Sequence, residues 1–427
     1  MKDKYLKPKF FDVWNDYNTK QFGNDFVAGI VVSIIALPLS IALALASGVE
    51  PVRGVYTAMI AGFLVSFLGG SQVQIAGPTA AFATIVAGIV SKSGMQGLII
   101  ATLMAGVLLV IMGLCKIGSY IKYVPKTITI GFTGGIAVTI LLGQIKDFLG
   151  ITYSKGTHAV ETIEKVEANI KNISTLSPAA IIIGVLSLII LILYPKFEKK
   201  IPASLIAVIV CSIIVKLIQP ISDNVYTIGE LYSVPTGLPK PVLSELHLGL
   251  NDVVDQIPNA FMIAILAAIE SLLSCVVADE MIDSKHKPNA ELVAQGFANM
   301  GSVVFGGIPA TGAIARTAAN VNNGGRTPIA GIFHAVFLAF MLLFLMPFVK
   351  LIPMPTIAAI LFIVAYNMSE WRKFVKIIKT KKWTDIIVLG LTFVLTVIFD
   401  LVVAICAGIA VVLIFTLIEK IKRKKEV

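Results

Sequence analysis

Charged residues are scarce in this sequence. Asp, Glu, Lys and Arg fill 14% of the 427 positions, whereas 57% of the residues are hydrophobic and the mean hydropathy is +0.89. A soluble domain carries nearer to ~25% charged residues. The composition therefore excludes an ordinary water-soluble protein and indicates a polytopic membrane protein.

Cysteine and histidine are also rare, with four residues of each type. The cysteines stand singly in apolar segments, as small core residues do: Cys115, Cys211, Cys275 and Cys406. The histidines are equally scattered, with His158 and His247 in outer connections, His286 in an inner loop and His334 inside an apolar segment. We expect His334 to be a satisfied helix-packing residue and no histidine to belong to a metal site.

Catalytic motifs and a signal peptide are missing. The sequence contains no H-E-x-x-H, no nucleophile elbow and no P-loop, so it predicts neither an enzyme nor an ATP-driven pump, and no cofactor. Residues 1–24 are polar and basic rather than a short charged head followed by an apolar run. We therefore expect no cleavable signal peptide and a cytosolic N-terminus.

Apolar runs predict 14 membrane segments in an all-α protein. They cover residues 26–48, 54–69, 78–91, 96–115, 126–149, 178–195, 201–219, 258–279, 290–306, 310–321, 327–348, 354–368, 383–399 and 401–420. With the N-terminus inside, the connections after even-numbered segments should be cytoplasmic and rich in basic residues.

The distribution of charge agrees with this count. Basic residues follow the fourth, sixth, eighth, tenth and twelfth segments and fill the tail, whereas the outer connection 220–257 carries five acidic residues against the single Lys240. The net charge of +10 therefore reflects the positive-inside pattern and not nucleic-acid binding. We expect a multi-pass protein of the cell membrane, in contact with lipid, with both termini in the cytoplasm.

One predicted segment, 310–321, is too short to span a membrane. Its 12 residues would form a helix of roughly 18 Å, against a hydrocarbon core of about 30 Å. Such a half-helix is tolerated only where its lead-in is buried in protein or lines a watery cavity, and its N-terminus then offers an anion site. Arg316 adds a positive charge there, which we interpret as functional, the alternative being a structural pair with a helix-end carbonyl or a carboxylate.

A second short segment, 78–91, mirrors the first. Each follows a Gly-Gly pair, Gly69-Gly70 or Gly306-Gly307, and they are the third and tenth of the 14 segments. This symmetry predicts two inverted halves of seven segments with a binding site at the midplane. Short extended pieces should lead into the half-helices, at 71–76 and 307–309. The alternative is that these glycines merely end helices and allow close packing.

Polar residues within the apolar runs are candidate site residues. Glu270 lies deep in the eighth segment and shares a helix face with Ser274, so this pair is a candidate for binding a proton or a cation, or for balancing Arg316. Asp279 and Glu280 at the end of that segment should be solvated. In the first segment, Pro38 should kink the helix, so that Ser40 and Leu43 line the site.

Six groups of residues are spread over nearly the whole chain. They are Ala36-Leu37-Pro38-Leu39-Ser40, Gly77-Pro78-Thr79-Ala80, Glu270-Ser271-Leu272-Leu273-Ser274-Cys275-Val276-Val277-Ala278-Asp279, Asn299-Met300 with Gly306-Gly307, Gly312-Ala313 with Ala315-Arg316-Thr317, and Gly324-Gly325-Arg326-Thr327-Pro328-Ile329-Ala330-Gly331. Together they resemble the sulfate permease (SulP) family of anion transporters.

The resemblance implies a seven-plus-seven inverted repeat shared with nucleobase permeases, in which a core domain moves against a gate domain. The transporter domain would cover 26–420, between a cytoplasmic segment 1–25 and a basic tail 421–427. Its core would consist of segments 1–4 and 8–11, about 26–115 and 258–348, and its gate of segments 5–7 and 12–14, about 126–219 and 354–420. A homodimer is expected. Family members usually continue into a cytoplasmic STAS domain, which we expect this chain, ending at Val427, to lack.

The resemblance also assigns roles to single residues. It places the substrate between the facing N-termini of segments three and ten, in contact with Thr79, Ala80, Gly312 and Ala313. Glu270 and Ser274 match positions that bind Na⁺ in the bicarbonate members, where the acid is Asp, although Glu fits proton-coupled relatives equally well. Ile314 stands where those members have a hydroxyl residue, which weakens a bicarbonate assignment.

The resulting hypothesis is a secondary active transporter of small anions that works by elevator-like alternating access. The anion would be bicarbonate, sulfate or a dicarboxylate, and H⁺ or Na⁺ would drive its transport through Glu270. The alternative is an uncoupled anion exchanger or channel, which the carboxylate argues against because it repels anions unless neutralised. A receptor or scaffold would not explain two half-helices directed at the midplane.

Overall fold

The computed structural model describes most of the chain. The described residues are 5–15, 17–123, 125–154, 159, 161–198, 201–218, 225–243, 249–380 and 382–398, with short pieces at 403–404, 407–412 and 414–415. Several sequence predictions lie outside them, namely those for His158, His247, Cys406, the tail 421–427 and most of the fourteenth segment.

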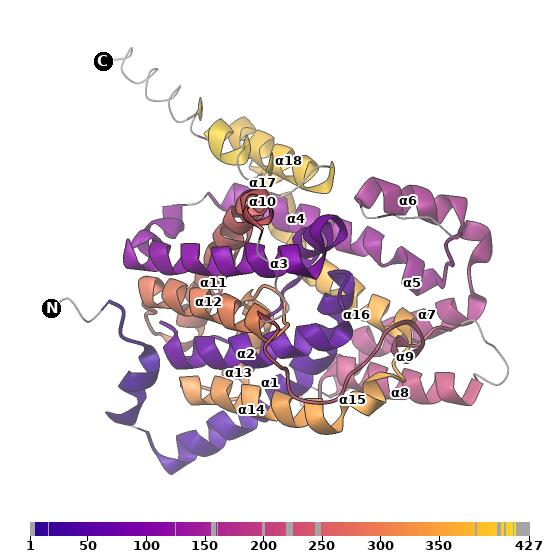
Figure 1. Ribbon diagram of the computed structural model, residues 1–427, viewed down its shortest axis with the longest axis horizontal. Helices are drawn as coiled ribbons and strands as arrows, with labels where there is room; N and C mark the ends of the chain where they lie inside the picture. The colour runs from indigo at the N-terminus through magenta and orange to yellow at the C-terminus, as the bar shows by residue number, and fades with distance from the viewer. Residues whose placement is uncertain are drawn as a thin grey trace.

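The described chain is almost entirely helical (Figure 1). Up to residue 218 the elements are η2 Lys9–Asn15, α1 Thr19–Ala46, α2 Pro51–Leu68, β1 Ala76–Gly77, η3 Ala80–Phe82, α3 Ala83–Leu114, η4 Ile117–Tyr123, α4 Lys126–Gly143, α5 Ile145–Leu149, α6 Thr162–Lys171, η5 Ile173–Thr175, α7 Pro178–Phe197 and α8 Ala203–Ile218. The later elements are α9 Ile228–Leu231, α10 Leu250–Asp255, α11 Ile257–Ile282, α12 Pro288–Val304, β2 Thr311–Gly312, α13 Ile314–Asn322, α14 Pro328–Phe344, α15 Met346–Val349, α16 Met354–Met368, α17 Trp371–Lys379 and α18 Trp383–Ile398. The first thirteen predicted segments all overlap these helices, with the third and fourth sharing α3, so the helical fold class is confirmed.

Proline and glycine set several helix boundaries. α2, α12 and α14 begin at Pro51, Pro288 and Pro328. Proline has no N–H group, and at the first position of a helix an N–H would have no acceptor within the helix in any case. Gly94, with φ of 64°, breaks α3 between the predicted third and fourth segments. The half-length third segment is therefore the part of α3 before this break.

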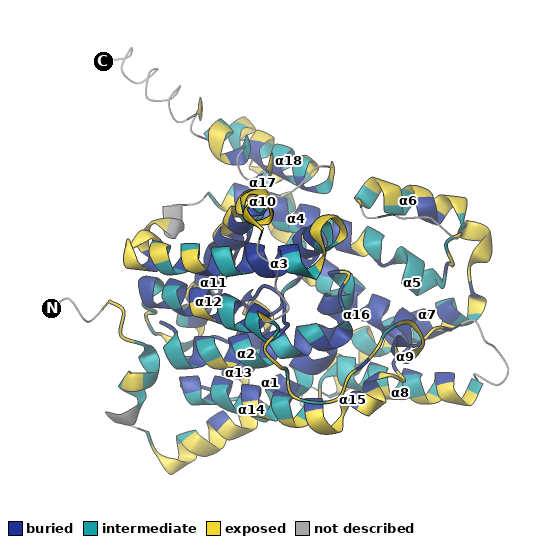
Figure 2. Cartoon of the chain, viewed as in Figure 1, coloured by how far each residue is buried: buried dark blue, intermediate teal, exposed yellow. Residues whose placement is uncertain are grey.

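The helices pack in two sets. α1, α2, α3, α11, α12, α13 and α14 contact one another, and α4, α5, α7, α8, α16 and α18 form the second set. Buried residues concentrate where helices meet, whereas outward faces stay exposed (Figure 2). Among the described residues, six helical stretches are long and apolar enough to cross a membrane. The division into a core and a gate, and their relative movement, stay predictions.

Two short strands cross at the centre of the first set. β1 and β2 pair antiparallel, with Ala76 opposite Gly312 and Gly77 opposite Thr311. The predicted limits were wrong by a few residues, because 71–76 overlaps β1 only at Ala76 and 307–309 ends before β2 begins. Glycine and proline mark where helices stop, but the strand positions depend on the partner backbone. α13 is accordingly shorter than predicted, at 9 residues or about 13.5 Å.

Candidate functional site

Two helical N-termini lie beside the crossed strands. η3 begins at Ala80, shortly after β1, and α13 begins at Ile314, shortly after β2. Within the described part of the chain, the N–H groups of Ala80, Ala81, Ile314 and Ala315 have no hydrogen-bond acceptor. Ile314 and Ala315 are also exposed. Free N–H groups and the positive end of a helix dipole together favour an anion at this point.

Arg316 joins the two halves of this site. Its side chain is 1% exposed, and Nη2 donates a hydrogen bond of 2.6 Å to the carbonyl oxygen of Pro78. The guanidinium lies so close to Gly77 that a Cβ there would collide with Nη1. Nε and Nη1 have no acceptor among the described residues. The fixed positive charge of α13 therefore lies at the lead-in of η3.

Glu270 contacts the same lead-in from α11. Its Oε2 accepts a hydrogen bond of 3.2 Å from the hydroxyl of Thr79. Among the ion pairs of the described residues, none joins Glu270 to Arg316. The guanidinium thus binds the Pro78 carbonyl oxygen and the carboxylate binds the Thr79 hydroxyl, with no ion pair between them.

The serines of α11 bind the opposite lead-in. Ser271 lies 2.7 Å from the hydroxyl of Thr311 and accepts a hydrogen bond from the N–H of Gly312 at 3.0 Å. Ser274 donates to the hydroxyl of Thr317 in α13 at 3.5 Å. Glu270 and Ser274 share a face of α11, as predicted, but they contact different half-helices.

The remaining predicted contacts are arranged differently. The N–H of Gly312 is taken by Ser271, and that of Ala313 donates to the carbonyl oxygen of Ile75 at 2.9 Å, so the free amides lie one to two residues later. In α1, which continues through Pro38, Ser40 and Leu43 are buried, at 0% and 2% exposure. The Ser40 carbonyl lies against Gly54 of α2, and a role of Ser40 and Leu43 at the site stays a prediction.

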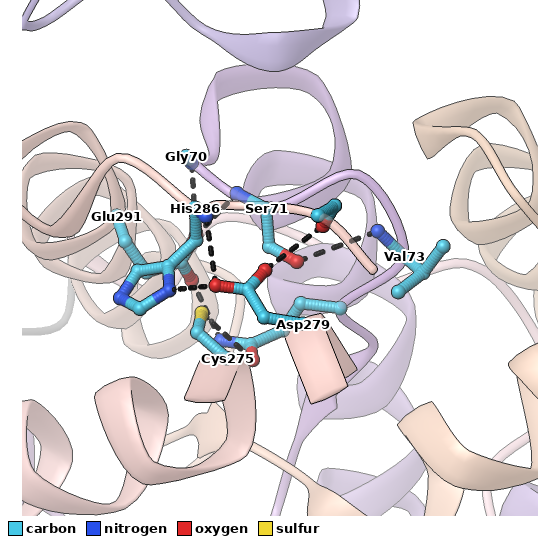
Figure 3. A network of polar contacts seen from close by, with 9 residues as sticks. Gly70, Ser71, Val73, Cys275, Asp279, His286 and Glu291 are labelled. Carbon is cyan, nitrogen blue, oxygen red and sulfur yellow. Dashed lines mark hydrogen bonds and ion pairs between the residues drawn. The ribbon is translucent and has the colours of Figure 1, made fainter. Parts of the chain in front are cut away.

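The sequence reading missed a polar face of α12. This face holds the first lead-in, the segment from Gly70 to Gln74 that precedes β1 and η3. Glu291 is fully buried, and its Oε2 accepts the N–H groups of Gly70 at 2.9 Å and Ser71 at 3.3 Å. Its Oε1 accepts the side-chain amides of Gln74 at 2.7 Å and Gln295 at 3.0 Å. Figure 3 shows Glu291 above the end of α11. All four partners donate, which suits an ionised carboxylate.

The same helix face holds the second lead-in. The side-chain amide of Asn299 donates to the carbonyl oxygen of Ala310 and accepts its N–H, both at 2.9 Å. One turn later, Ser302 donates to the carbonyl oxygen of Ile308 at 2.7 Å. Glu291, Gln295, Asn299 and Ser302 follow at spacings of four, four and three, so they share one face, and this periodicity was the available signal.

Gln74 connects this face to the crossing. Its Oε1 accepts a hydrogen bond from Cys275 Sγ of α11 at 3.1 Å, and its side chain lies directly against Gly312. A Cβ at position 312 would collide with the Gln74 amide. One side chain therefore touches α11, α12 and β2, and Cys275 donates a hydrogen bond as well as packing in the core.

The structure corrects the prediction that Asp279 is solvated. Its carboxylate is 17% exposed and lies 2.7 Å from Nδ1 of His286, whose backbone N–H also donates to it at 2.9 Å (Figure 3). Ser284 donates to the other oxygen at 2.9 Å. The loop after α11 folds back over the carboxylate, which its sequence does not reveal. Glu280 is exposed, as predicted.

His334 is buried, as expected, but it is not satisfied. Its side chain is 0% exposed, and neither ring nitrogen has a hydrogen-bond partner among the described residues. The ring packs beside Gly62 of α2, and Gly29 of α1 packs against its backbone. Glycines allow this close packing but offer no side-chain acceptor, so the prediction of a satisfied histidine was wrong.

The sequence matches the model of the sulfate permease family over residues 22–392. The chain belongs to the sulfate permease family. It is 42% identical over 412 residues to YvdB of Bacillus subtilis (strain 168), provisionally named a sulfate transporter, a match that covers 95% of this chain and 76% of that protein. It is 29% identical over 416 residues to the bicarbonate transporter BicA of Picosynechococcus sp., covering 95% and 72%.

Solved structures of similar proteins share the fold. The transmembrane domain of a cyanobacterial bicarbonate transporter, BicA, superposes with a TM-score of 0.79 at 27% identity, covering 92% of this chain and all of that one. Murine Solute Carrier 26 family member A9 gives 0.87 at 17% identity, covering 97% and 71%, a likeness of fold alone. This sulfate permease family member is therefore a multi-pass membrane protein, its architecture fits the seven-plus-seven repeat, and its family consists of transporters rather than enzymes.

Proposed function

We propose that this protein is a secondary active transporter of small anions. The supporting observation is the pair of helical N-termini beside the β1–β2 crossing, with free amides on both sides and the buried Arg316 between them. The anion would accept hydrogen bonds from the amides of Ala80, Ala81, Ile314 and Ala315. Arg316 would act mainly through its charge, since its guanidinium faces Pro78 and Gly77.

The driving ion would act at Glu270. Thr79 donates its one hydroxyl proton to this carboxylate, so a proton or cation arriving at Glu270 would free the hydroxyl to donate to the anion instead. Among the described residues no three His, Cys, Asp or Glu side chains gather as metal ligands. A transported Na⁺ would therefore depend on Glu270 together with hydroxyl and carbonyl oxygens, which suit a hard cation, whereas a proton needs Glu270 alone.

Elevator-like movement would carry the site across the membrane. Every contact to the anion site described above comes from α11, α12, α13, η3, the two strands or the chain next to them, and α11, α12 and α13 belong to the first packing set. The site could thus move as one body against α4, α5, α7, α8, α16 and α18. The alternative, an uncoupled exchanger or channel, would leave the carboxylate at Glu270 without a role.

Uptake into proteoliposomes tests this proposal. Radiolabelled sulfate, bicarbonate and fumarate are each offered with a pH gradient, a Na⁺ gradient or neither, and the names of the relatives make sulfate and bicarbonate the first choices. We expect one anion to accumulate above equilibrium with one gradient only. If the anion only equilibrates across the membrane whichever gradient is applied, the result would favour the exchanger or channel.

A Glu270→Gln variant separates coupling from binding. It keeps a side-chain oxygen for the Thr79 hydroxyl but cannot carry a titrating charge. We expect counterflow of the anion to continue while gradient-driven accumulation is lost. The matched control is Glu280→Gln, because Glu280 is exposed at the end of the same helix. Gradient-driven accumulation by Glu270→Gln at the rate of the control would exclude Glu270 as the coupling residue.

A further inference from the structure

α17 is a short helix inserted between two membrane segments. Its 9 residues would extend only about 13.5 Å, too short to cross a bilayer. Two residues, 369–370, separate it from α16, and three residues, 380–382, separate it from α18. Glu370 has φ of 42°, a left-handed conformation that turns the chain sharply at the start of α17. These short connections hold α17 at the level where both neighbours end.

One face of α17 packs on the protein. Phe374 and Ile377 are the only two of its residues that are partly buried. The Phe374 ring meets Phe393 of α18 at a centroid distance of 5.4 Å and lies beside Gly134 of α4. Both of these helices belong to the second packing set, so α17 is fixed to the expected gate.

A second face is apolar and exposed. Trp371, Val375 and Ile378 lie at spacings of four and three, so they share a side of the helix, and they are 47%, 37% and 44% exposed. The indole N–H of Trp371 donates to the hydroxyl of Tyr366 at 3.1 Å. Trp and Tyr at one level are typical of the membrane–water interface, where an apolar ring and a polar group are both satisfied.

The third face is cationic. Arg372, Lys376 and Lys379 repeat the same spacing one residue later, and all three are exposed. Lys373 is paired with Glu370 at 2.6 Å, whereas the other three cations form no ion pair among the described residues. Three unneutralised charges therefore line a helix whose adjacent face is apolar.

We propose that α17 lies in the cytoplasmic membrane interface and binds anionic phospholipid head groups. Its apolar face would enter the acyl boundary, while Arg372, Lys376 and Lys379 meet the head groups. The proposal rests on the cytoplasmic placement that the positive-inside pattern predicts, and not on the identity of the transported anion. Bound lipid would anchor the gate while the core moves.

Quenching of Trp371 fluorescence tests the proposal in reconstituted protein. Trp14→Phe and Trp383→Phe leave Trp371 as the only tryptophan of the chain. Two vesicle preparations each contain about one fifth phosphatidylglycerol in phosphatidylcholine. In the first, the phosphatidylglycerol carries brominated chains. In the second, an equal mole fraction of phosphatidylcholine carries them instead. Bromine quenches nearby indole, so we expect about twofold stronger quenching from labelled phosphatidylglycerol, and the difference should shrink in high salt.

A charge variant isolates the head-group contact. Arg372→Gln, Lys376→Gln and Lys379→Gln together should make the two labelled lipids quench equally. The control replaces three exposed lysines outside α17, Lys20→Gln in α1, Lys196→Gln in α7 and Lys285→Gln after α11, and should retain the difference. Equal quenching by both lipids in the unmodified α17 would overturn the head-group preference. No quenching by either lipid would show that α17 faces the cytosol and is available to a protein partner instead.

Discussion

Replacing Glu291 by Gln tests the polar face of α12 as the support of the anion site. The two carboxylate oxygens accept four hydrogen bonds from Gly70, Ser71, Gln74 and Gln295 in a fully buried position. The variant keeps the shape of the side chain but removes the charge and turns one acceptor into a donor. The backbone N–H groups cannot adjust, so the remaining oxygen must stay with Gly70 and Ser71.

The magnitude follows from these four bonds. A hydrogen bond to a charged group contributes about 1.5–3 kcal/mol and a neutral one about 0.5–1.5, a difference of roughly 1 kcal/mol each. The Gln295 amide can turn at little cost, because its Oε1 has no partner among the described residues, but turning Gln74 breaks its bond from Cys275. We therefore expect Glu291→Gln to destabilise the protein by about 2–4 kcal/mol. Glu291→Ala should cost more, since four buried donors lose their acceptor.

The assay is thermal unfolding in detergent, followed by uptake in proteoliposomes. We expect Glu291→Gln to unfold several degrees below the matched control Glu280→Gln, and to transport with raised KM, because the segment from Gly70 to Gln74 positions Thr79 and Ala80. A variant as stable as the control, with unchanged KM, would refute the idea that this carboxylate holds the first lead-in.

Three further substitutions probe single contacts. Gly77→Ala drives a methyl group into the Arg316 guanidinium, so we expect a loss of about 1–3 kcal/mol in thermal stability together with lost uptake; normal uptake would contradict the described contact. Asn299→Leu removes both bonds to the Ala310 backbone and leaves two buried groups unpaired, which should lower stability by about 2–6 kcal/mol; a neutral effect in the same unfolding assay would place the second lead-in elsewhere. Gly94→Ala strains a backbone conformation, φ of 64° and ψ of −169°, that is almost confined to glycine, with open space around it, so a loss of about 1–3 kcal/mol with intact uptake is expected, and abolished uptake would assign the break in α3 a larger role.

Much of the architecture was readable from the sequence because membrane helices are specified locally. Each must satisfy its own backbone hydrogen bonds, so a run of apolar residues bounded by proline, glycine or charge suffices to place it. This is why thirteen predicted segments coincide with helices and why the break at Gly94 falls between two of them. The two half-helices were recognised for the same reason, through their length and their glycine pairs.

The composition of the site was readable in part. Glu270 and Arg316 stood out because a charge in an apolar run is rare, and both do lie beside the crossed strands. Glu291 escaped notice because it lies near the end of its segment, where charges are common. The role of the polar face that Glu291 shares with Asn299 is evident only from the backbone segments that this face binds.

The sequence by itself determined where the chain forms helices, which segments are too short to cross the membrane, and which family they belong to. Only the tertiary structure decided which atoms face each other at the crossing: that Arg316 bonds to Pro78, that Glu270 bonds to Thr79, and that Gln74 lies against Gly312. Helices follow from contacts between near neighbours along the chain. The crossing joins segments more than 200 residues apart, and no local pattern encodes the register in which two short strands meet.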